Sequence, residues 1–398
     1  MFDVGKALGG LGKWDRFLRI GDALKMPHRG FTPLEPDEPA SNPGQLRMLF
    51  YIPPAMAADR ALVVVLHGCG QTAAGYNHGA GWSTLADRYG FALLLPEQQR
   101  SNNPNDCFNW FEPGDTCRGV GEAASIRAMI EKMVHEHQID PRRVFVTGLS
   151  AGGAMTSVML ACYPELFAGG AIIAGLPYGA AGNVQQAFQS MFQSPSRQAR
   201  EWGDLVRQAA PHHKGPWPRV SVWHGHADKT VIPANAREIL KQWADVHGVP
   251  LTPSLETVVD GYPRQVWLSN AGEEVIESYS ITHMAHGTPL ATGDVEFGCG
   301  ASGPFLLEVG ISSSFHVAKF FGLTQAGVRS SSLIRKDGAA SMALSPVSRS
   351  ADPQPQILHG EILTDDVDTI ERARPVPPRI DIGAVINKAL EAAGLLRR

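Results

Sequence analysis

Cysteine, blocks of basic residues and long apolar runs are scarce or missing in this sequence. Five cysteines among 398 residues are few and odd in number, so we expect no disulfide framework to hold this fold. The formal net charge is −4, and without a basic block the charge pattern gives no support to a nucleic acid as partner. No apolar stretch reaches the roughly 18 residues that a membrane span needs, so we expect no transmembrane segment. The content of 43% hydrophobic and 19% charged residues is that of an ordinary globular protein.

The first twenty residues also lack the continuous apolar segment of a secretory signal. Charged side chains interrupt them at Lys6, Lys13, Asp15, Arg16 and Arg19. We therefore expect a cytoplasmic or granule-associated protein, and we leave open secretion by another route.

The cysteines leave one short-range pairing open. Cys107 and Cys117 stand ten residues apart and could form a disulfide across a loop, which would indicate an oxidising compartment. Because no second pair with matching spacing accompanies them, we expect no zinc site. We expect the protein to need no metal and no other cofactor.

The composition divides the chain into four parts. Residues 1–45 are expected to form an N-terminal extension with a loop-like run over 33–43, and residues 46–323 one large domain. Residues 324–379 are rich in proline and serine, which predicts a disordered linker. Residues 380–398 could place apolar side chains on one face of a C-terminal amphipathic helix. Such a helix would pack on its own domain or dock to a partner, for instance a polymer granule.

Within residues 46–323, strand-like and helix-like segments alternate, which predicts an α/β fold with a mainly parallel sheet covered by helices. The main strand-like segments are 47–52, 61–66, 92–95, 144–147, 171–174, 220–224 and 275–281, with a further one at 267–268. The helix-like segments are 82–89, 121–137, 151–162 and 233–247.

The most informative motif is Gly148-Leu-Ser-Ala-Gly152, directly after the strand-like run 144–147 and before a helix-like run. A serine at a sharp strand-to-helix turn holds its hydroxyl clear of the sheet, beside the free N–H groups of the helix start. Glycines on both sides allow the close packing that such a turn needs. We interpret Ser150 as a nucleophile; the alternative is an ordinary turn rich in glycine and serine.

A serine nucleophile needs a base, and an acid that orients the base; in an α/β-hydrolase the chain order is serine, acid, histidine. Asp228 lies just past the strand 220–224, at the edge of the sheet where such folds hold their sites, so it is our candidate acid. Its alternative role is to close an Asx turn or to cap the next helix.

Position alone does not separate two candidate bases. His283 and His286 both follow the strand that ends at Ile281. His224 and His226 are further candidates, for which we expect structural roles beside the sheet edge.

Ester chemistry through a serine also needs backbone donors for the developing oxyanion. The amide of Ala151, the residue after Ser150, is one candidate. The loop Leu66-His-Gly-Cys-Gly-Gln71 follows an early strand, and the Cys69 amide is the second candidate. The Cys69 thiol could itself be a nucleophile, but the sequence supports that weakly.

Residues of about 46–323 resemble the catalytic domain of poly(3-hydroxybutyrate) depolymerases, within the wider family that includes feruloyl and acetylxylan esterases. The resemblance rests on His67-Gly-Cys-Gly-Gln71, Cys107-Phe-Asn-Trp-Phe111, Arg118-Gly-Val-Gly-Glu122, Ile139-Asp-Pro-Arg-Arg143, Gly148-Leu-Ser-Ala-Gly-Gly153, Trp223-His-Gly-His-Ala-Asp228, Met284-Ala-His-Gly-Thr-Pro289, Cys299-Gly300 and Phe320-Phe-Gly-Leu323.

The resemblance implies an α/β-hydrolase fold and assigns the base to His286, in a stretch where the family has glycines at positions 283 and 285. It also implies Ser150 as nucleophile, Asp228 as acid and the Cys69 amide as an oxyanion donor. Trp110 and Phe111 could line an apolar acyl groove, or pack in the core.

The expected activity is that of a serine esterase on poly(3-hydroxybutyrate) or hydroxyalkanoate oligomers. Secreted members of the family carry a signal peptide and a polymer-binding domain, and we find neither in the sequence, which favours oligomers or amorphous granules as substrate. The alternatives are an esterase for aryl or sugar esters, and a non-catalytic granule protein with a vestigial site.

Overall fold

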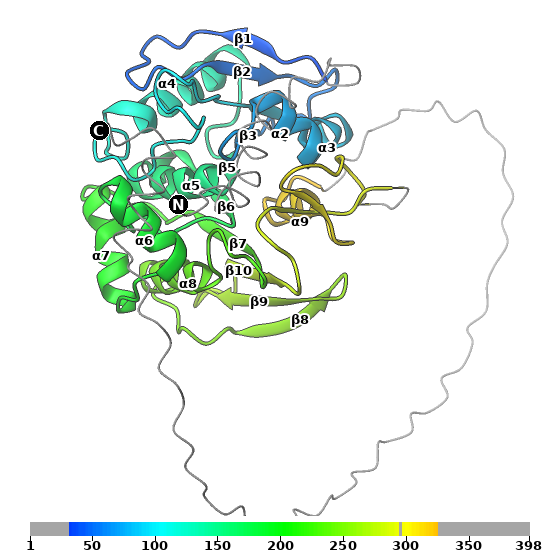
Figure 1. The fold of residues 1–398 in the computed structure, drawn as a ribbon. Coiled ribbons are helices and arrows are strands. Elements are labelled where there is room, and N and C mark those ends of the chain that lie inside the picture. Colours follow the sequence, from blue (N-terminus) through cyan, green and yellow to red (C-terminus); the bar gives the residue numbers. More distant parts are fainter. Residues whose placement is uncertain (1–31, 294–296, 325–398) are drawn as a thin grey trace, which may run out of the picture. The chain divides into compact units, whose positions relative to one another are not determined.

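The structure is a computed structural model that describes residues 32–293 and 297–324. Its centre is a ten-stranded sheet with the order β1-β2-β4-β3-β5-β6-β7-β10-β9-β8 (Figure 1). Every neighbouring pair from β4 to β10 is parallel, whereas β1 and β2 at one end and β9 and β8 at the other are antiparallel. The strands are β1 (Glu35–Asp37), β2 (Met48–Tyr51), β3 (Leu62–Leu66), β4 (Ala92–Leu94), β5 (Val144–Leu149), β6 (Gly169–Ile173), β7 (Arg219–Gly225), β8 (Leu255–Val259), β9 (Tyr262–Leu268) and β10 (Glu274–Ile281). The mainly parallel sheet confirms the predicted fold class.

Helices cover both faces of this sheet (Figure 1). In β3 the side chains alternate: Leu62, Val64 and Leu66 belong to one apolar core, and Val63 and Val65 to the other. The first core is shared with α4 (Gly121–Glu136), α5 (Ala151–Cys162), α6 (Val184–Gln193), α7 (Ala199–Ala209) and α8 (Ala234–His247). The second is shared with α2 (Ala73–Ala80), α3 (Trp82–Tyr89) and α9 (Ser313–Phe320). Burial on both faces explains the continuous apolar runs of the central strands.

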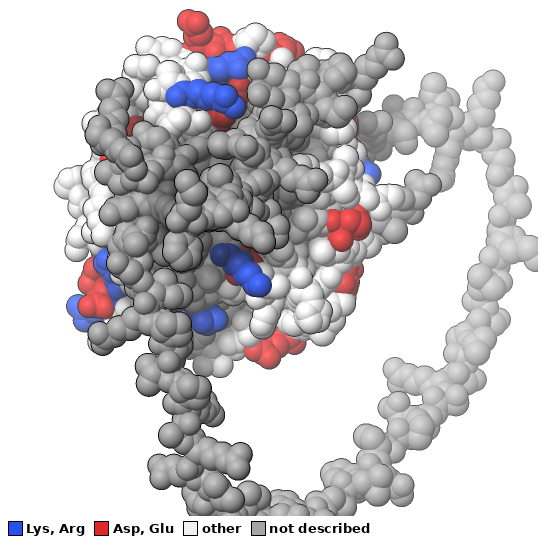
Figure 2. Space-filling view, viewed as in Figure 1, with Lys and Arg blue, Asp and Glu red and all other residues white. Residues whose placement is uncertain are grey.

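Smaller elements complete the described part of the chain. A short two-stranded parallel sheet pairs β11 (Thr288–Leu290) with β12 (Leu306–Glu308), and the turn η3 (Pro164–Leu166) follows α5. On the visible part of the face in Figure 2, acidic and basic side chains both occur. Within 32–293 and 297–324, no helix is both long and apolar enough to cross a bilayer.

The structure differs from the sequence prediction at the N-terminal side of the domain. The run 33–43 was expected to be a loop, but Glu35–Asp37 forms β1, which pairs with β2 at the edge of the main sheet. Three residues with a proline among them carry too little periodicity to reveal an edge strand. The predicted helix 380–398 and all but residue 324 of the predicted linker lie outside the described residues, as do residues 1–31.

A close backbone contact joins α5 to the end of β3. A Cβ atom at Gly152 would lie 2.3 Å from the carbonyl oxygen of Leu66 and 2.5 Å from that of His67, and one at Gly148 would lie 2.4 Å from the Gly152 backbone. Real side chains do not tolerate such distances to backbone atoms, so the turn between β5 and α5 requires glycine at both positions. All twelve residues of α5 are buried, which holds this helix against the sheet.

We expect Gly152→Ala to lower the free energy of unfolding by at least about 2 kcal/mol, because the added methyl group must push α5 away from β3. Urea unfolding followed by circular dichroism measures the change. Gly114→Ala is the matched control: a Cβ atom there meets nothing within 4 Å, so its unfolding curve should overlay that of the parent. Equal unfolding curves for Gly152→Ala and the parent would contradict this account.

Candidate active site

Ser150 occupies the turn between β5 and α5. Its backbone has φ 57° and ψ −116°, a conformation that non-glycine residues adopt at a cost, and such strain concentrates at functional sites. The turn is held from both sides: the Ser150 N–H donates to Ile173 O on β6 at 2.9 Å, and Ser150 O accepts from Ala154 N at 2.8 Å. The side chain is half-buried at the carboxyl end of β5. The strand-turn-helix that the motif predicted is therefore present.

The structure brings together the three residues predicted from the serine, acid and base motifs. His286 Nε2 lies 2.9 Å from Ser150 Oγ, and His286 Nδ1 lies 2.7 Å from Asp228 Oδ2. An ionised carboxylate only accepts hydrogen bonds, so Nδ1 carries the proton and Nε2 is left to accept from the serine hydroxyl. Asp228 and His286 follow β7 and β10, so all three side chains lie at the carboxyl edge of the parallel strands.

Backbone hydrogen bonds join the loop after β7, which carries Asp228, to the loop after β10, which carries His286. The Ala227 N–H donates to Met284 O at 2.9 Å, and the His226 N–H donates to Ile281 O at 2.9 Å. A Cβ atom at Gly225 would lie 2.4 Å from Met284 O, so this approach also requires glycine. The separation of Asp228 from His286 is consequently set by main chain and not by flexible side chains alone.

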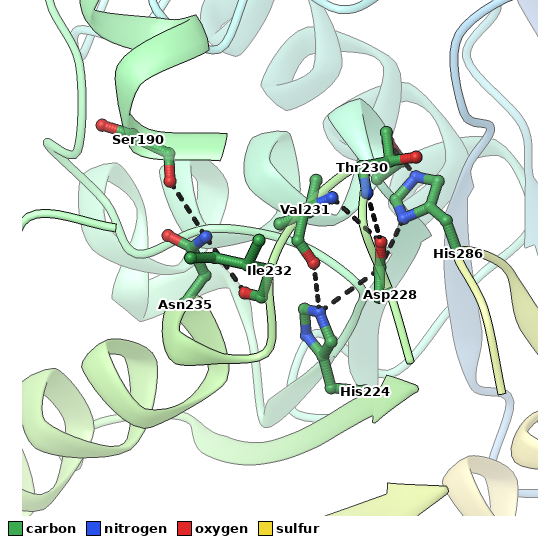
Figure 3. A network of polar contacts seen from close by, with 9 residues as sticks. Ser190, His224, Asp228, Thr230, Val231, Ile232, Asn235 and His286 are labelled. Carbon is green, nitrogen blue, oxygen red and sulfur yellow. Dashed lines mark hydrogen bonds and ion pairs between the residues drawn. The ribbon is translucent and has the colours of Figure 1, made fainter. Parts of the chain in front are cut away.

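Asp228 is only 3% exposed and its carboxylate is well supplied with donors (Figure 3). Oδ1 accepts from the N–H groups of Thr230 at 2.8 Å and Val231 at 3.0 Å, while Oδ2 faces His286. Burial by itself raises the pKa of this carboxyl, but hydrogen bonds from His224 and His286 outweigh burial and hold the pKa well below its usual range. The two interpretations of Asp228 coincide, since one oxygen closes an Asx turn and the other orients a histidine.

The other candidate histidines occupy different environments. His283 is exposed and adopts φ 60°, the left-handed region that favours glycine. His226 is also exposed, so the packing role expected for it is wrong. His224 is buried as expected, yet it also contacts Asp228, which the sequence pattern did not indicate.

The two candidate oxyanion donors lie on segments that touch each other. Ala151 is the first residue of α5, so its amide has no carbonyl four residues earlier within the helix. Cys69 lies in the loop after β3, and the start of that loop packs against Gly152. The structure thus places the Ala151 amide at the turn that carries Ser150 and the start of the Cys69 loop beside that turn; the role of either amide as an oxyanion donor stays a prediction.

The structure corrects the cysteine assignment. Cys69 is bonded to Cys107, and Cys117 is a free, exposed thiol, so the pairing of Cys107 with Cys117 is wrong. The partners are 38 residues apart and meet only because the loop after β4 returns to the loop after β3, which spacing along the sequence does not show. The bond also removes Cys69 as a nucleophile, because its sulfur is not a free thiolate.

A buried network of hydrogen bonds also holds the loop after β3, which carries Cys69. The His67 ring donates through Nδ1 to Gly68 O at 2.8 Å, so its Nε2 accepts from the Gln98 N–H at 3.1 Å. The Gln98 amide donates to Cys107 O at 3.0 Å and to the carboxyl group of Glu122, which also accepts from Asn109 N at 2.9 Å. Burial lowers the pKa of His67, which keeps the ring in the neutral form that this pattern needs. Sequence reasoning missed the network because its members come from four separate segments.

The two predicted aromatic residues show mainly packing contacts. Trp110 is 8% exposed and belongs to the apolar core, and Phe111 is half-buried against it in an edge-to-face arrangement with ring centroids 5.4 Å apart. Contact of either ring with an acyl group stays a prediction.

Comparison with known proteins places this site in a family. Residues 46–252 match the family model described as Esterase PHB depolymerase. The chain belongs to this family. It is 47% identical over 283 residues to poly(3-hydroxyalkanoate) depolymerase C of Paucimonas lemoignei, an alignment that covers 71% of this chain and 68% of that protein.

Two other kinds of esterase are also similar to the chain. Acetylxylan esterase of Coprinopsis cinerea is 34% identical over 261 residues, covering 64% of this chain and 69% of that protein. Feruloyl esterase B of Neurospora crassa is 36% identical over 233 residues, covering 57% and 77%. The solved acetyl xylan esterase from Aspergillus awamori shares the fold with a TM-score of 0.62 at 24% identity, covering 73% of this chain and all of that one. The fold and the family together make the chain an α/β-hydrolase of the carboxylic ester hydrolases.

We expect Cys107→Ser to lower the free energy of unfolding by about 2–4 kcal/mol, because the loop closed by the disulfide becomes free in the unfolded chain. Guanidinium unfolding without reductant measures this. Cys117→Ser is the control, since that thiol is exposed and unpaired, and it should leave the transition unchanged. The assignment of the disulfide fails if both variants unfold at the denaturant concentration of the parent.

Glu122 gives a pH-dependent prediction. Burial, with a smaller contribution from Asp115, raises the pKa of its carboxyl to about 8. The folded state keeps the Glu122 proton, whereas the unfolded chain releases it above about pH 4.5. The contribution of this proton to the free energy of unfolding is therefore complete below pH 4.5 and is lost as the pH rises to about 8. The difference in unfolding free energy between the parent and Glu122→Gln should therefore fall across this window, by at most about 1.4 kcal/mol per pH unit. A difference that stays constant from pH 5 to pH 8 would contradict this account.

Proposed function

We propose that the protein hydrolyses ester bonds of poly(3-hydroxyalkanoate) chains or their oligomers, with Ser150 as nucleophile. The observation that carries the proposal is the hydrogen-bonded sequence of Ser150 Oγ, His286 and Asp228 at the carboxyl edge of the sheet. A serine hydroxyl is a weak nucleophile at neutral pH, and this arrangement is what activates it.

In the first step, Ser150 Oγ attacks the ester carbonyl carbon while its proton passes to His286 Nε2. The imidazolium formed is stabilised by the Asp228 carboxylate, which is buried and ionised. Negative charge develops on the carbonyl oxygen, where the Cys69 and Ala151 amides donate hydrogen bonds. One such donor lowers the barrier by roughly 3 kcal/mol.

The tetrahedral intermediate then collapses and the bond to the alcohol oxygen breaks. His286 gives its proton to that oxygen, which leaves an acyl group on Ser150 and releases a hydroxyl-terminated chain. A water molecule repeats the attack with His286 as base, which releases the acid and restores Ser150. The residues present supply every proton transfer in this cycle.

The substrate class rests on similarity. The 47% identity to a poly(3-hydroxyalkanoate) depolymerase supports a hydroxyalkanoate ester over the aryl and sugar esters of the relatives at 34% and 36%. Those relatives make an aryl or sugar ester the second candidate. Docking to granules through residues 380–398 stays a separate proposal, because these residues lie outside the described part of the chain.

The Cys69–Cys107 bond bears on where the protein works. Structural disulfides persist in oxidising compartments, so this pair supports a location outside the reducing cytoplasm. That weighs against the cytoplasmic location expected from the first twenty residues and in favour of export.

We expect Ser150→Ala and His286→Ala to lose hydrolysis of p-nitrophenyl butyrate by roughly 10⁶-fold in kcat while remaining folded. His283→Asn is the matched control: asparagine accepts the left-handed backbone of this exposed residue, and the rate should stay that of the parent. Retained hydrolysis in Ser150→Ala would overturn the mechanism, whereas a folded parent that hydrolyses no ester would favour a non-catalytic granule protein.

The parent should release 3-hydroxybutyrate or its short oligomers from amorphous poly(3-hydroxybutyrate) faster than it cleaves methyl ferulate or acetylated xylan. Product analysis of the three incubations side by side measures the preference. Cleavage of methyl ferulate or acetylated xylan alone would replace the hydroxyalkanoate with the second candidate.

A further inference from the structure

A second histidine contacts the acid of the site. His224, near the end of β7, is 4% exposed, and its Nε2 lies 2.7 Å from Val231 O and 3.3 Å from Asp228 Oδ2 (Figure 3). The sequence suggested only a packing role for this residue, and the triad chemistry does not use it. Its distance from Asp228 therefore needs its own explanation.

The hydrogen bonds determine which ring nitrogen carries the proton. A carbonyl oxygen only accepts, so the nitrogen 2.7 Å from Val231 O must be an N–H donor. The other nitrogen, Nδ1, is buried and has no hydrogen-bond partner among the described residues. A second proton on Nδ1 would be an unpaired buried donor, which is costly. Nε2–H is consequently a fixed donor directed at the loop that carries Asp228.

His224 closes the turn that presents the acid. Val231 uses both of its backbone groups here: its N–H donates to Asp228 Oδ1 at 3.0 Å, and its carbonyl accepts from His224. The same Nε2–H also faces Asp228 Oδ2, the oxygen that accepts a hydrogen bond from His286 Nδ1 at 2.7 Å. His224 thus restrains both oxygens of the carboxylate, one through Val231 and one directly.

The next residues tie this turn to α6. The Ile232 N–H donates to Met191 O at 2.9 Å, and the Asn235 amide donates to Ser190 O at 3.0 Å and Ile232 O at 3.2 Å (Figure 3). These contacts hold the far end of the turn without touching the carboxylate. Of these residues, His224 on β7 is the one whose ring contacts the Asp228 carboxylate itself, where it restricts rotation of that group.

We propose that His224 is a positioning residue, which holds the Asp228 carboxylate in the orientation that the His286 Nδ1–H requires. The inference rests on the proposed function for its rate prediction, although the geometric claim stands without a substrate. Without this donor the Val231 carbonyl is left unpaired, and Asp228 keeps its three hydrogen bonds but loses the 3.3 Å contact of Oδ2 with His224 Nε2.

The chain offers a matched control for the structural part of the change. The His247 ring, part-buried at the end of α8, donates through Nε2 to Pro218 O at 3.1 Å and has no contact with Asp228 among the described residues. Replacing His247 by phenylalanine also removes a histidine donor from a backbone carbonyl, but far from the acid.

The kinetic test compares His224→Phe, His224→Gln and His247→Phe on p-nitrophenyl butyrate. We expect kcat to fall by about tenfold or more in His224→Phe with KM unchanged, because the lost donor weakens the transition state and not binding. His224→Gln, whose amide reaches the position of Nε2, should recover most of kcat. His247→Phe should lower stability while leaving kcat near that of the parent. An unchanged kcat in His224→Phe, or an equal fall in His247→Phe, would overturn the proposal.

A readout without substrate separates this inference from the proposed function. The His286 Nδ1–H held by Asp228 should give a far-downfield proton resonance in the parent that moves or disappears in His224→Phe and persists in His224→Gln. If the parent cleaves no ester but the resonance responds in this way, the proposed function fails and the positioning role stands. If the resonance is the same in His224→Phe and in the parent, the positioning role is wrong. Should His224→Phe not fold, His224→Asn takes its place, because its shorter amide does not reach Val231 O.

Discussion

The contact on which the rest of the site depends is the approach of Gly152 to the backbone of Leu66 and His67. It brings the first turn of α5 against the end of β3 with no side chain between them. Ser150 directly precedes α5, Ala151 is its first residue and Cys69 follows β3, so this contact holds together the two segments that carry the nucleophile and the candidate oxyanion donors. A site assembled from separate segments gains its precision from such contacts, since rigid main chain moves less than side chains.

The second half of the site depends on satisfying a buried charge. The Asp228 carboxylate is buried, where an unpaired ion would be costly; it accepts hydrogen bonds from two backbone amides and from His286, and His224 Nε2 lies 3.3 Å from it. Each of those donors restricts the orientation of the carboxylate. The requirement to stabilise the charge and the requirement to orient His286 are thus met by the same bonds.

Sequence reasoning reached those parts of the site whose signal is local. Ser150 stands in a motif whose glycines and flanking strand are contiguous, and Asp228 follows a single strand. His286 could not be separated from His283 by position, because the distinction depends on which side chain the loop turns towards Asp228. The Cys69–Cys107 pair and the contact of His224 with Asp228 were beyond reach for the same physical reason: they join segments whose meeting is decided by the packing of the whole sheet.

The loop that carries Cys69 shows why such long-range contacts gather at this site. His67-Gly-Cys-Gly-Gln71 contains two glycines, so its backbone has little intrinsic preference for one conformation and must be ordered from outside. The disulfide to Cys107 holds the middle of this segment, and Gln98, through His67 and the Cys107 carbonyl, links it to the same returning loop. Small residues would let the Cys69 amide, the candidate donor, approach an oxyanion closely. The disulfide and the hydrogen bonds of Gln98 restrict the backbone conformations that the glycines leave open.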